Sequence, residues 1–456
     1  MIHFGLSEYV PYVLYAAGIV AFLLSIFWRP IVGIYFLVPL IPLQTVRYHL
    51  IGLPLGQSVV DIILFGVVVG LLIRGEQILP KTPWNVLLGV YAVYTFVSLC
   101  LGSFYLGAFL PFSPTDPRLA DWKNYMIMPL ILLLVAATVK DARQMKVIVL
   151  LMCVATLSLD RSFWDTVGDR DFSSFTDDLR DEGGMGYAGV NGLAAFEAAF
   201  TALLIALSAF EPKRLLKYAY LALAGFSVMC LMYSLSRGGY LALLVGSLFL
   251  GIVKQRKLLI ILGVFLFTWT SVVPVAVRQR VMMTYDTNTG TLEHSAATRV
   301  SLWEEAMHVF DSNPLVGVGF YTYAYSEHLN NYKDSHNIYV KVLVETGVVG
   351  LMMFLWLLAK TFRAGFGLFR SSPDRFLASL GLGLAVWVVC AAIANFFGDR
   401  WTYLQVNGYM WVLGGLVARA LLIEENAPSA AVEENSEARE RDTLVEVPEP
   451  QTAGVA

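Results

Sequence analysis

Long apolar runs separated by short polar connections make up most of the chain. A helix needs about 20 apolar residues to cross the ~30 Å hydrocarbon layer of a membrane. Thirteen runs approach this length, at 9–27, 30–46, 58–73, 84–104, 124–139, 146–160, 189–210, 217–234, 238–253, 257–275, 337–359, 376–397 and 402–423. The second run is the weakest candidate because it contains Pro39 and Pro42. The pattern predicts an all-α, polytopic membrane bundle of about 12–13 transmembrane helices.

The composition agrees with this pattern and excludes a freely soluble enzyme. Of the 456 residues, 57% are hydrophobic and 15% are charged, whereas soluble domains contain about 25% charged residues. The net charge of −3 is unevenly distributed, because residues 424–456 hold nine acids and two arginines, a net charge of −7. The rest of the chain therefore carries +4. We expect 424–456, which is rich in Glu, Ala and Pro, to be a disordered acidic tail.

The positions of lysine and arginine predict an orientation in the membrane. Connections rich in these residues usually face the cytoplasm, and here they alternate along the chain, at 140–146, 213–217, 254–257 and 360–375. We therefore expect these connections and the tail to be cytoplasmic. No Lys or Arg precedes the first apolar run, so we expect a retained helix there and not a cleaved signal peptide.

Two segments expected on the opposite, external side are too long to be simple connections. Segment 160–188 holds eight acids, and segment 276–336 contains ATRVSLWEEAMHVF at 297–310. The latter predicts an amphipathic helix whose apolar face carries Val300, Trp303, Met307 and Phe310. The chain thus divides into membrane helices and one loop (160–188) within 1–275, a large loop at 276–336, further membrane helices at 337–423, and the tail at 424–456.

No feature of the sequence indicates a metal, a cofactor or a nucleic-acid partner. The four cysteines all lie within apolar runs, where a free cysteine behaves as a small hydrophobic residue. The acids of 160–188 have no recurring ligand spacing, so we interpret them as a solvated acidic face.

The first candidate for chemistry is SRGG at 236–239, a turn between two apolar runs. A charged residue at a membrane boundary, such as Arg237, usually has a partner or a function. Gly238 and Gly239 allow close approach of the backbone. An arginine that extends from a helix end toward water would give the same pattern, and the two interpretations are about equally supported by the turn alone.

The second candidate is Arg299, near the start of the predicted loop helix, with Arg278 and Arg280 upstream. The planar guanidinium fork fits phosphate oxygens, and a helix N-terminus attracts anions. Taken alone, a solvated arginine is the commoner arrangement, and Arg278 and Arg280 also fit a simple exit from the membrane.

The third candidate is DSHNIYVKVLVETGVVGL at 334–351. His336 precedes a long apolar helix that Asp334 or Ser335 would cap. An imidazole at the membrane interface is suited to act as a general base, although a histidine bonded to the helix end fits equally well.

Other polar residues near these candidates have possible supporting roles. Glu345 lies two to three turns below His336 and either pairs with Lys341, four residues earlier, or supports the reaction. The full set of possible supporting residues is Ser236, Asn337, Glu345 and Asn191.

Together and in this order, the three candidates resemble the O-antigen ligase/polymerase superfamily (the WaaL and Wzy group). The resemblance rests on SRGG, on TRVSLWEEAMHVFDSNPLVGVGF at 298–320 and on SHNIYVKVLVETGVVGL at 335–351. GYAGVNGLAAFEA at 186–198 is similar to the Gly…Asn…Ala start of a central helix in that family. The region with motifs covers about 186–360, whereas the N-terminal half is similar only as a run of membrane helices.

The resemblance implies a metal-independent glycosyltransferase of the GT-C type in the bacterial inner membrane, with its site facing the periplasm. Its donor would be a glycan linked to undecaprenyl pyrophosphate, and its acceptor a hydroxyl of the lipid A core or of a protein. On matching positions, Arg237 and Arg299 would hold the donor pyrophosphate and His336 would activate the acceptor. A single displacement predicts inversion at the anomeric carbon. One departure is the count of thirteen runs, because ligases of this family have twelve helices.

Two alternatives remain open. A polymerase of the same superfamily would use the same donor with a lipid-linked glycan as acceptor, and we favour a ligase because His336 and the large loop fit it well. A lipid-linked oligosaccharide flippase or other transporter would require charged residues within the spans, whereas most charges here lie at external helix ends.

Overall fold

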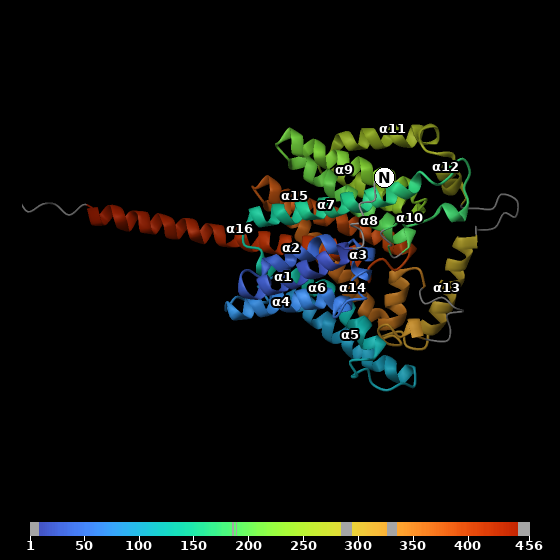
Figure 1. Ribbon diagram of the computed structural model, residues 1–456, viewed down its shortest axis with the longest axis horizontal. Coiled ribbons are helices and arrows are strands. Elements are labelled where there is room, and N and C mark those ends of the chain that lie inside the picture. Colours follow the sequence, from blue (N-terminus) through green and yellow to red (C-terminus); the bar gives the residue numbers. More distant parts are fainter. Residues whose placement is uncertain (1–8, 185–186, 188, 284–293, 326–334, 446–456) are drawn as a thin grey trace, which may run out of the picture.

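The computed structural model describes residues 9–184, 187, 189–283, 294–325 and 335–445. Every regular element in these ranges is helical (Figure 1), so the predicted all-α class is confirmed. The α-helices are α1 (Val10–Phe27), α2 (Ile31–Leu40), α3 (Gln44–Tyr48), α4 (Val59–Ile73), α5 (Asn85–Tyr105), α6 (Pro117–Thr138), α7 (Ala142–Val167), α8 (Val190–Phe210), α9 (Arg214–Tyr233), α10 (Arg237–Val253), α11 (Arg256–Val272), α12 (Val275–Met282), α13 (His294–Phe310), α14 (Ile338–Ser371), α15 (Arg375–Ala394) and α16 (Leu404–Val445).

Ten helices of the described chain are long and apolar enough to cross a membrane, which makes this a polytopic membrane protein. α11 and α12 are bent by 110° and would together form an eleventh span. The expected count of 12–13 also included α2 and α10, which have only 10 and 17 residues. α2 ends one residue after Pro39, as the weakness of that run suggested.

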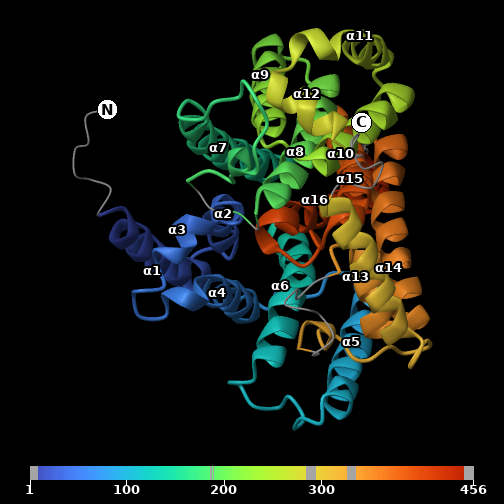
Figure 2. The same ribbon diagram turned by 90° about the vertical axis from the view of Figure 1, so that its right-hand side faces the viewer.

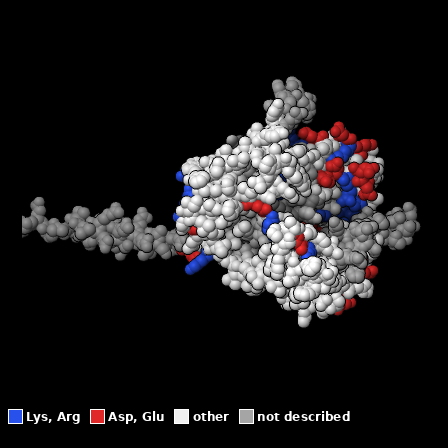
Figure 3. Space-filling view, turned by 60° about the horizontal axis from the view of Figure 1, so that its bottom comes forward, with Lys and Arg blue, Asp and Glu red and all other residues white. Residues whose placement is uncertain are grey.

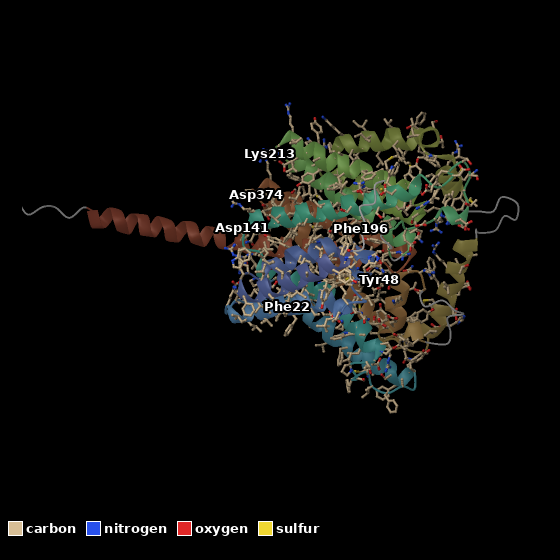
Figure 4. The ribbon with its side chains drawn as sticks, viewed as in Figure 1. Phe22, Tyr48, Asp141, Phe196, Lys213 and Asp374 are labelled. Carbon is tan, nitrogen blue, oxygen red and sulfur yellow. The ribbon has the colours of Figure 1, made fainter. Side chains whose placement is uncertain are left out.

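The centre of the bundle is α8, which is buried on almost all sides and packs against α9, α10 and α15. Its small side chains allow close packing: the alanines at 194, 198, 202 and 206 are all buried. Phe196, near the middle of the molecule in Figure 4, adds a large apolar side chain with no exposed surface. α8 therefore forms a rigid support for whatever lies at its two ends.

On the face in Figure 3, charged side chains gather at the two ends of the long axis, and a smaller group lies near its middle. α16 projects from one end, where Asp141, Lys213 and Asp374 also lie (Figures 1 and 4). α12 and α13 lie toward the other end. The structure thus separates the basic connections at 140–146 and 213–217 from the described parts of the large loop.

Two polar stretches are more helical than we expected. α14 continues to Ser371, so most of the basic stretch 360–375 is helix and not loop. α16 runs on to Val445, where we expected disorder from Glu424. Glutamate, alanine and arginine are abundant after Glu424 and have high helix propensity, which a composition-based expectation of disorder does not weigh. Residues 446–456 lie outside the described chain.

The predicted loop helix exists as α13 but begins at His294, earlier than 297, and buries a different face. Leu302, Ala306 and Val309 are buried, whereas Val300 and Met307 are about 40% exposed. Both sets have helical spacing, so the sequence left the choice of face to tertiary packing. In Figure 2, α13 crosses in front of α14, which it contacts.

The chain after α13 is anchored to α14 at a break in that helix. Gly347 interrupts α14 with a φ of 65°, in the left-handed region. There the N–H groups of Val318 and Gly319 donate to the carbonyl oxygens of Val344 (3.0 Å) and Glu345 (2.8 Å). The break therefore fixes the segment that follows α13 against the bundle.

Candidate functional site

An arginine-rich pocket opens beside the N-terminal ends of α8 and α10. Its volume, including the part open to solvent, is about 420 Å³. Its lining consists of Arg180, Asn191, Ala195, Ser236, Arg237, Gly238, Gly239, Arg280, Arg299, Ala394, Phe397 and Arg400. We call it the arginine pocket. Five of its lining residues are arginines that come from five separate segments of the chain. Among the residues that the structure describes, no Asp or Glu lines it.

Asn191 joins the segments that form one wall of the pocket. It lies in the first turn of α8, and its Oδ1 accepts hydrogen bonds from Arg180 Nη2 (3.0 Å) and from Ser236 Oγ (2.8 Å). The start of α10 approaches α8 closely because position 239 is glycine: a Cβ there would lie 2.7 Å from the Cβ of Ala194. The SRGG turn thus places Arg237 beside Asn191.

Arg237 and Arg280 connect this wall to α12. Arg237 Nη1 donates to the carbonyl oxygen of Met283 at 2.8 Å. Arg280 is only 3% exposed, and its guanidinium carbon lies 4.9 Å from the centre of the Phe175 ring. α12 is held in turn to the segment after α7, because Gln279 Oε1 accepts from the N–H of Phe175 (2.6 Å).

The arginines of the pocket influence one another electrostatically. The pKa of Arg180 is lowered, first by burial and then by the positive charge of Arg280, with smaller contributions from Arg299 and Arg237, while Asp177 opposes the shift. Several like charges thus raise the free energy of one another in a partly buried space. A bound anion relieves this repulsion, and guanidinium groups bind phosphate oxygens in a bidentate manner.

The structure places Arg237, Arg299, Arg280, Ser236 and Asn191 of the predicted residues in one pocket, but not Arg278. Arg278 Nη1 donates instead to the carbonyl oxygen of Thr270 at 3.0 Å, which turns it toward the end of α11. Arg180 and Arg400 line the pocket and were missed. Arg400 lies between two apolar runs, as Arg237 does, so the same boundary argument applied to it would have found it.

His336 does not line the arginine pocket. α13 connects the segment before His336 to the pocket, because α13 carries both Arg299 and Trp303. Arg299 and Trp303 lie four residues apart, about one turn of α13, and Trp303 Nε1 donates to the carbonyl oxygen of Ser335 at 3.0 Å. His336 itself has a φ of 52°, an uncommon conformation for a residue with a Cβ that is often found at functional sites. The residue after it, Asn337, caps α14 by accepting from the N–H of Tyr339 (2.9 Å) and of Val340 (3.3 Å).

That cap differs from our expectation of Asp334 or Ser335. Asp334 lies outside the described residues, and Ser335 Oγ donates to the carbonyl oxygen of Asn337 at 3.0 Å. Asn337 therefore fixes the start of α14 directly after His336, and its supporting role in the reaction stays a prediction.

Lys341, one turn into α14, forms a buried ion pair with Asp399 (Nζ to Oδ2, 2.8 Å). Burial alone would raise the pKa of Asp399, but Lys341 and hydrogen bonds from Thr402 hold it below its ordinary value. Glu345 is buried beneath the site at the break in α14, and its carbonyl oxygen accepts from Gly319 N–H. Glu345 does not line the arginine pocket.

Among the described residues, no group of three or more His, Cys, Asp or Glu side chains is arranged to hold a metal ion. All four cysteines are free, as the sequence predicted.

A family model described as O-antigen ligase matches residues 219–355. The match includes α10 with Arg237, α12, α13 with Arg299, and the first part of α14. These residues, less than half of the chain, are similar to the O-antigen ligase family. The O-antigen ligase/polymerase superfamily predicted from the sequence is thus confirmed, and the match supports a function of the ligase or polymerase type at this coarse level. No curated protein is similar enough to the whole chain to count as a match.

Proposed function

We propose that the protein is an O-antigen ligase-like glycosyltransferase that moves a glycan from undecaprenyl pyrophosphate to an acceptor hydroxyl at the periplasmic face of the bacterial inner membrane. The observation that carries the proposal is the convergence of five arginines, from five separate segments of the described chain, on one pocket. A pyrophosphate diester is the anionic part of such a donor. Its bonds to guanidinium groups strengthen as the leaving group gains negative charge.

In the proposed reaction, the acceptor oxygen attacks the anomeric carbon of the donor glycan. His336 takes the proton of the acceptor hydroxyl, and the bond from the anomeric carbon to the pyrophosphate oxygen breaks. Undecaprenyl pyrophosphate leaves with the electron pair, and Arg237 and Arg299 neutralise the charge. The other arginines of the pocket add to this field. A single displacement inverts the configuration and requires neither a metal nor a cofactor.

The position of His336 supports its role as the base. Trp303 connects Ser335 to the helix of Arg299, so the histidine is held beside the pocket and not within it. A base outside the phosphate site can approach the acceptor on the face opposite the leaving group. The Asn337 side chain caps α14 directly after His336, whose own φ is 52°.

One observation bears on the alternative that the protein is a transporter, which would require charged residues within the spans. Asp160 and Glu197 are fully buried within α7 and α8, and Ser227 Oγ donates to Asp160 Oδ2 at 2.7 Å. Two acidic residues therefore lie within the spans, in addition to the charged residues at helix ends. Neither acid lines the arginine pocket, so we retain the transferase proposal.

Reconstitution with a purified lipid-linked glycan tests the function and separates ligase from polymerase. Lipid A core, a peptide hydroxyl and a second lipid-linked glycan are offered in turn as acceptor. We expect transfer to lipid A core or to the peptide, with an inverted anomeric bond. Elongation of the lipid-linked glycan alone would identify a polymerase, and movement of the donor across the bilayer without transfer would support a transporter.

A further inference from the structure

A second pocket lies at the other end of the bundle, at the ends of α8 and α14 and the starts of α7, α9 and α15. It encloses about 960 Å³ and is open to the outside. Figure 4 shows Lys213 and Asp374 from its lining at the end from which α16 projects. The lining consists of Lys146, Leu207, Phe210, Glu211, Pro212, Lys213, Leu216, Tyr220, Pro373, Asp374, Arg375, Phe376 and Ser379. We call it the basal pocket.

The basal pocket combines an apolar wall with a cationic rim. Leu207 is buried in the wall, with Phe210 and Phe376 half-buried beside it. Lys146, Lys213 and Arg375 are exposed on the rim and come from three different segments. Lys254 adds a fourth cation nearby, since its Nζ lies 4.5 Å from the centre of the Phe210 ring.

The two acids of the lining, Asp374 and Glu211, accept hydrogen bonds from backbone N–H groups. Asp374 Oδ1 accepts from the N–H groups of Phe376 (2.7 Å) and Leu377 (2.9 Å) and so caps α15. Glu211 Oε1 accepts from the N–H of Lys213 at 3.0 Å. In the described part of the chain, no salt bridge connects these acids to the three rim cations. The acids of the lining therefore do not form ion pairs with the rim, and Lys146 Nζ lies 5.1 Å from the centre of the Phe376 ring in the wall.

An apolar wall that continues into a cationic rim matches the two parts of a phospholipid. Basic pockets between transmembrane helices on the cytoplasmic side bind anionic lipid headgroups, and the sequence predicts that these connections face that side. A soluble anion would use the rim but would gain nothing from Leu207, Phe210 and Phe376. The charge and the wall together favour a lipid.

We infer that the basal pocket binds an anionic phospholipid of the bilayer. Its phosphate contacts Lys146, Lys213 and Arg375, and one acyl chain packs against Leu207, Phe210 and Phe376. The site is separate from the arginine pocket and goes beyond the proposed transfer reaction. α8 connects the two, because Asn191 at one end of the helix lines the first pocket and Leu207 and Phe210 at the other end line the second.

The test measures lipid binding to the full chain purified in neutral detergent, by native mass spectrometry with added phosphatidylglycerol or phosphatidylcholine. The pocket variant is K146Q/K213Q/R375Q. The control variant, R143Q/K257Q/R370Q, removes three positive charges from exposed residues of basic stretches outside the pocket lining. Each cation near an anionic headgroup contributes about fivefold to affinity. We expect the pocket variant to bind phosphatidylglycerol roughly a hundredfold more weakly and the control variant to bind like the wild type.

Several results would overturn the inference. Equal losses in the two variants would show a general effect of surface charge. Unchanged binding in the pocket variant would exclude the site. Equal binding of phosphatidylcholine, or displacement of the lipid by millimolar inorganic phosphate, would show that the pocket does not select an anionic lipid.

If the triple variant does not fold, the single substitution of an exposed residue, Lys213→Gln, tests the site instead. We expect it to lower the affinity for phosphatidylglycerol about fivefold. Wild-type binding by this variant would also count against the site. Variants of the arginine pocket should keep the lipid, so a failure of the proposed transfer reaction leaves this test intact.

Discussion

Lys341 and Asp399 form a buried ion pair, with Nζ and Oδ2 2.8 Å apart, between the first turns of α14 and the turn that carries Arg400. Their side chains are 7% and 3% exposed. Since His336 precedes α14 and Arg400 lines the arginine pocket, the pair connects the proposed base to the proposed phosphate site. The ion pair thus fixes the position of His336 relative to Arg400, although neither Lys341 nor Asp399 lines the arginine pocket.

Removal of one partner of this pair should destabilise the protein. Asp399→Asn leaves a buried ammonium without its carboxylate, which typically costs about 3–5 kcal/mol. The pKa of Asp399 is held below its ordinary value, so the stabilisation is present above about pH 3.9 and is lost only as the pH falls through the lower folded value. The difference in melting temperature between wild type and variant should therefore be constant from pH 5 to 8. A difference that disappears by pH 5 would contradict this.

Arg180 and Arg400 should contribute to donor binding although the sequence did not single them out. Arg180→Gln and Arg400→Gln each remove a charged donor from the pocket lining, and such a bond contributes about 1.5–3 kcal/mol. We expect each variant to bind the lipid-linked donor roughly 10- to 100-fold more weakly. Arg278→Gln is the matched control, because Arg278 bonds to Thr270 outside the pocket. A loss as large in Arg278→Gln would mean that the donor does not lie in this pocket.

Transfer should continue in the presence of excess EDTA. In the proposed mechanism, the arginines neutralise the pyrophosphate leaving group, which a metal ion can also do. The assay compares initial rates of transfer with and without the chelator. Loss of activity that Mg²⁺ or Mn²⁺ restores would disprove the arginine mechanism.

The sequence predicted the fold well where it depends on local pattern. Each of the thirteen apolar runs forms a helix, because apolar length and helix formation are local properties. The arginine pocket could be predicted only in part. Arg237 and Arg299 stood in recognisable motifs, whereas Arg180 lies in an acidic stretch that we interpreted as a solvated face. Its place depends on a hydrogen bond to Asn191, eleven residues later, which no periodicity reports.

The buried face of α13 was also beyond the sequence. Val300 and Leu302 both begin apolar stripes with helical spacing, and only contact with α14 selects Leu302. Likewise, the basic stretch 360–375 looked like a loop because of its charge. The structure extends α14 through it, since long basic side chains project from a helix as readily as from a loop.

The two long segments, 160–188 and 276–336, should both lie on one side of the membrane, and the C-terminal tail should lie on the other side. Ser312 follows α13, and Ser436 lies in the part of the chain after the last span. Single cysteines at these positions, in a chain whose four native cysteines are replaced, should react with a membrane-impermeant maleimide from opposite sides. We expect Ser312→Cys to be labelled from the periplasm. Labelling of both positions from the same side would exclude the predicted orientation.

The central claim is that His336 is the base and that the arginines hold the donor, and one experiment on four proteins tests it most directly. Donor retention and single-turnover transfer are measured together for the wild type, Arg299→Ala, His336→Ala and His336→Gly. Loss of a general base typically lowers the rate by about 10²–10⁴. The glycine variant controls for backbone strain, because glycine adopts the φ of 52° at position 336 without cost. We predict that both His336 variants retain the donor but do not transfer it, and that Arg299→Ala loses both activities. Transfer at the wild-type rate by His336→Ala would contradict the assignment and leave His336 as a helix-end residue.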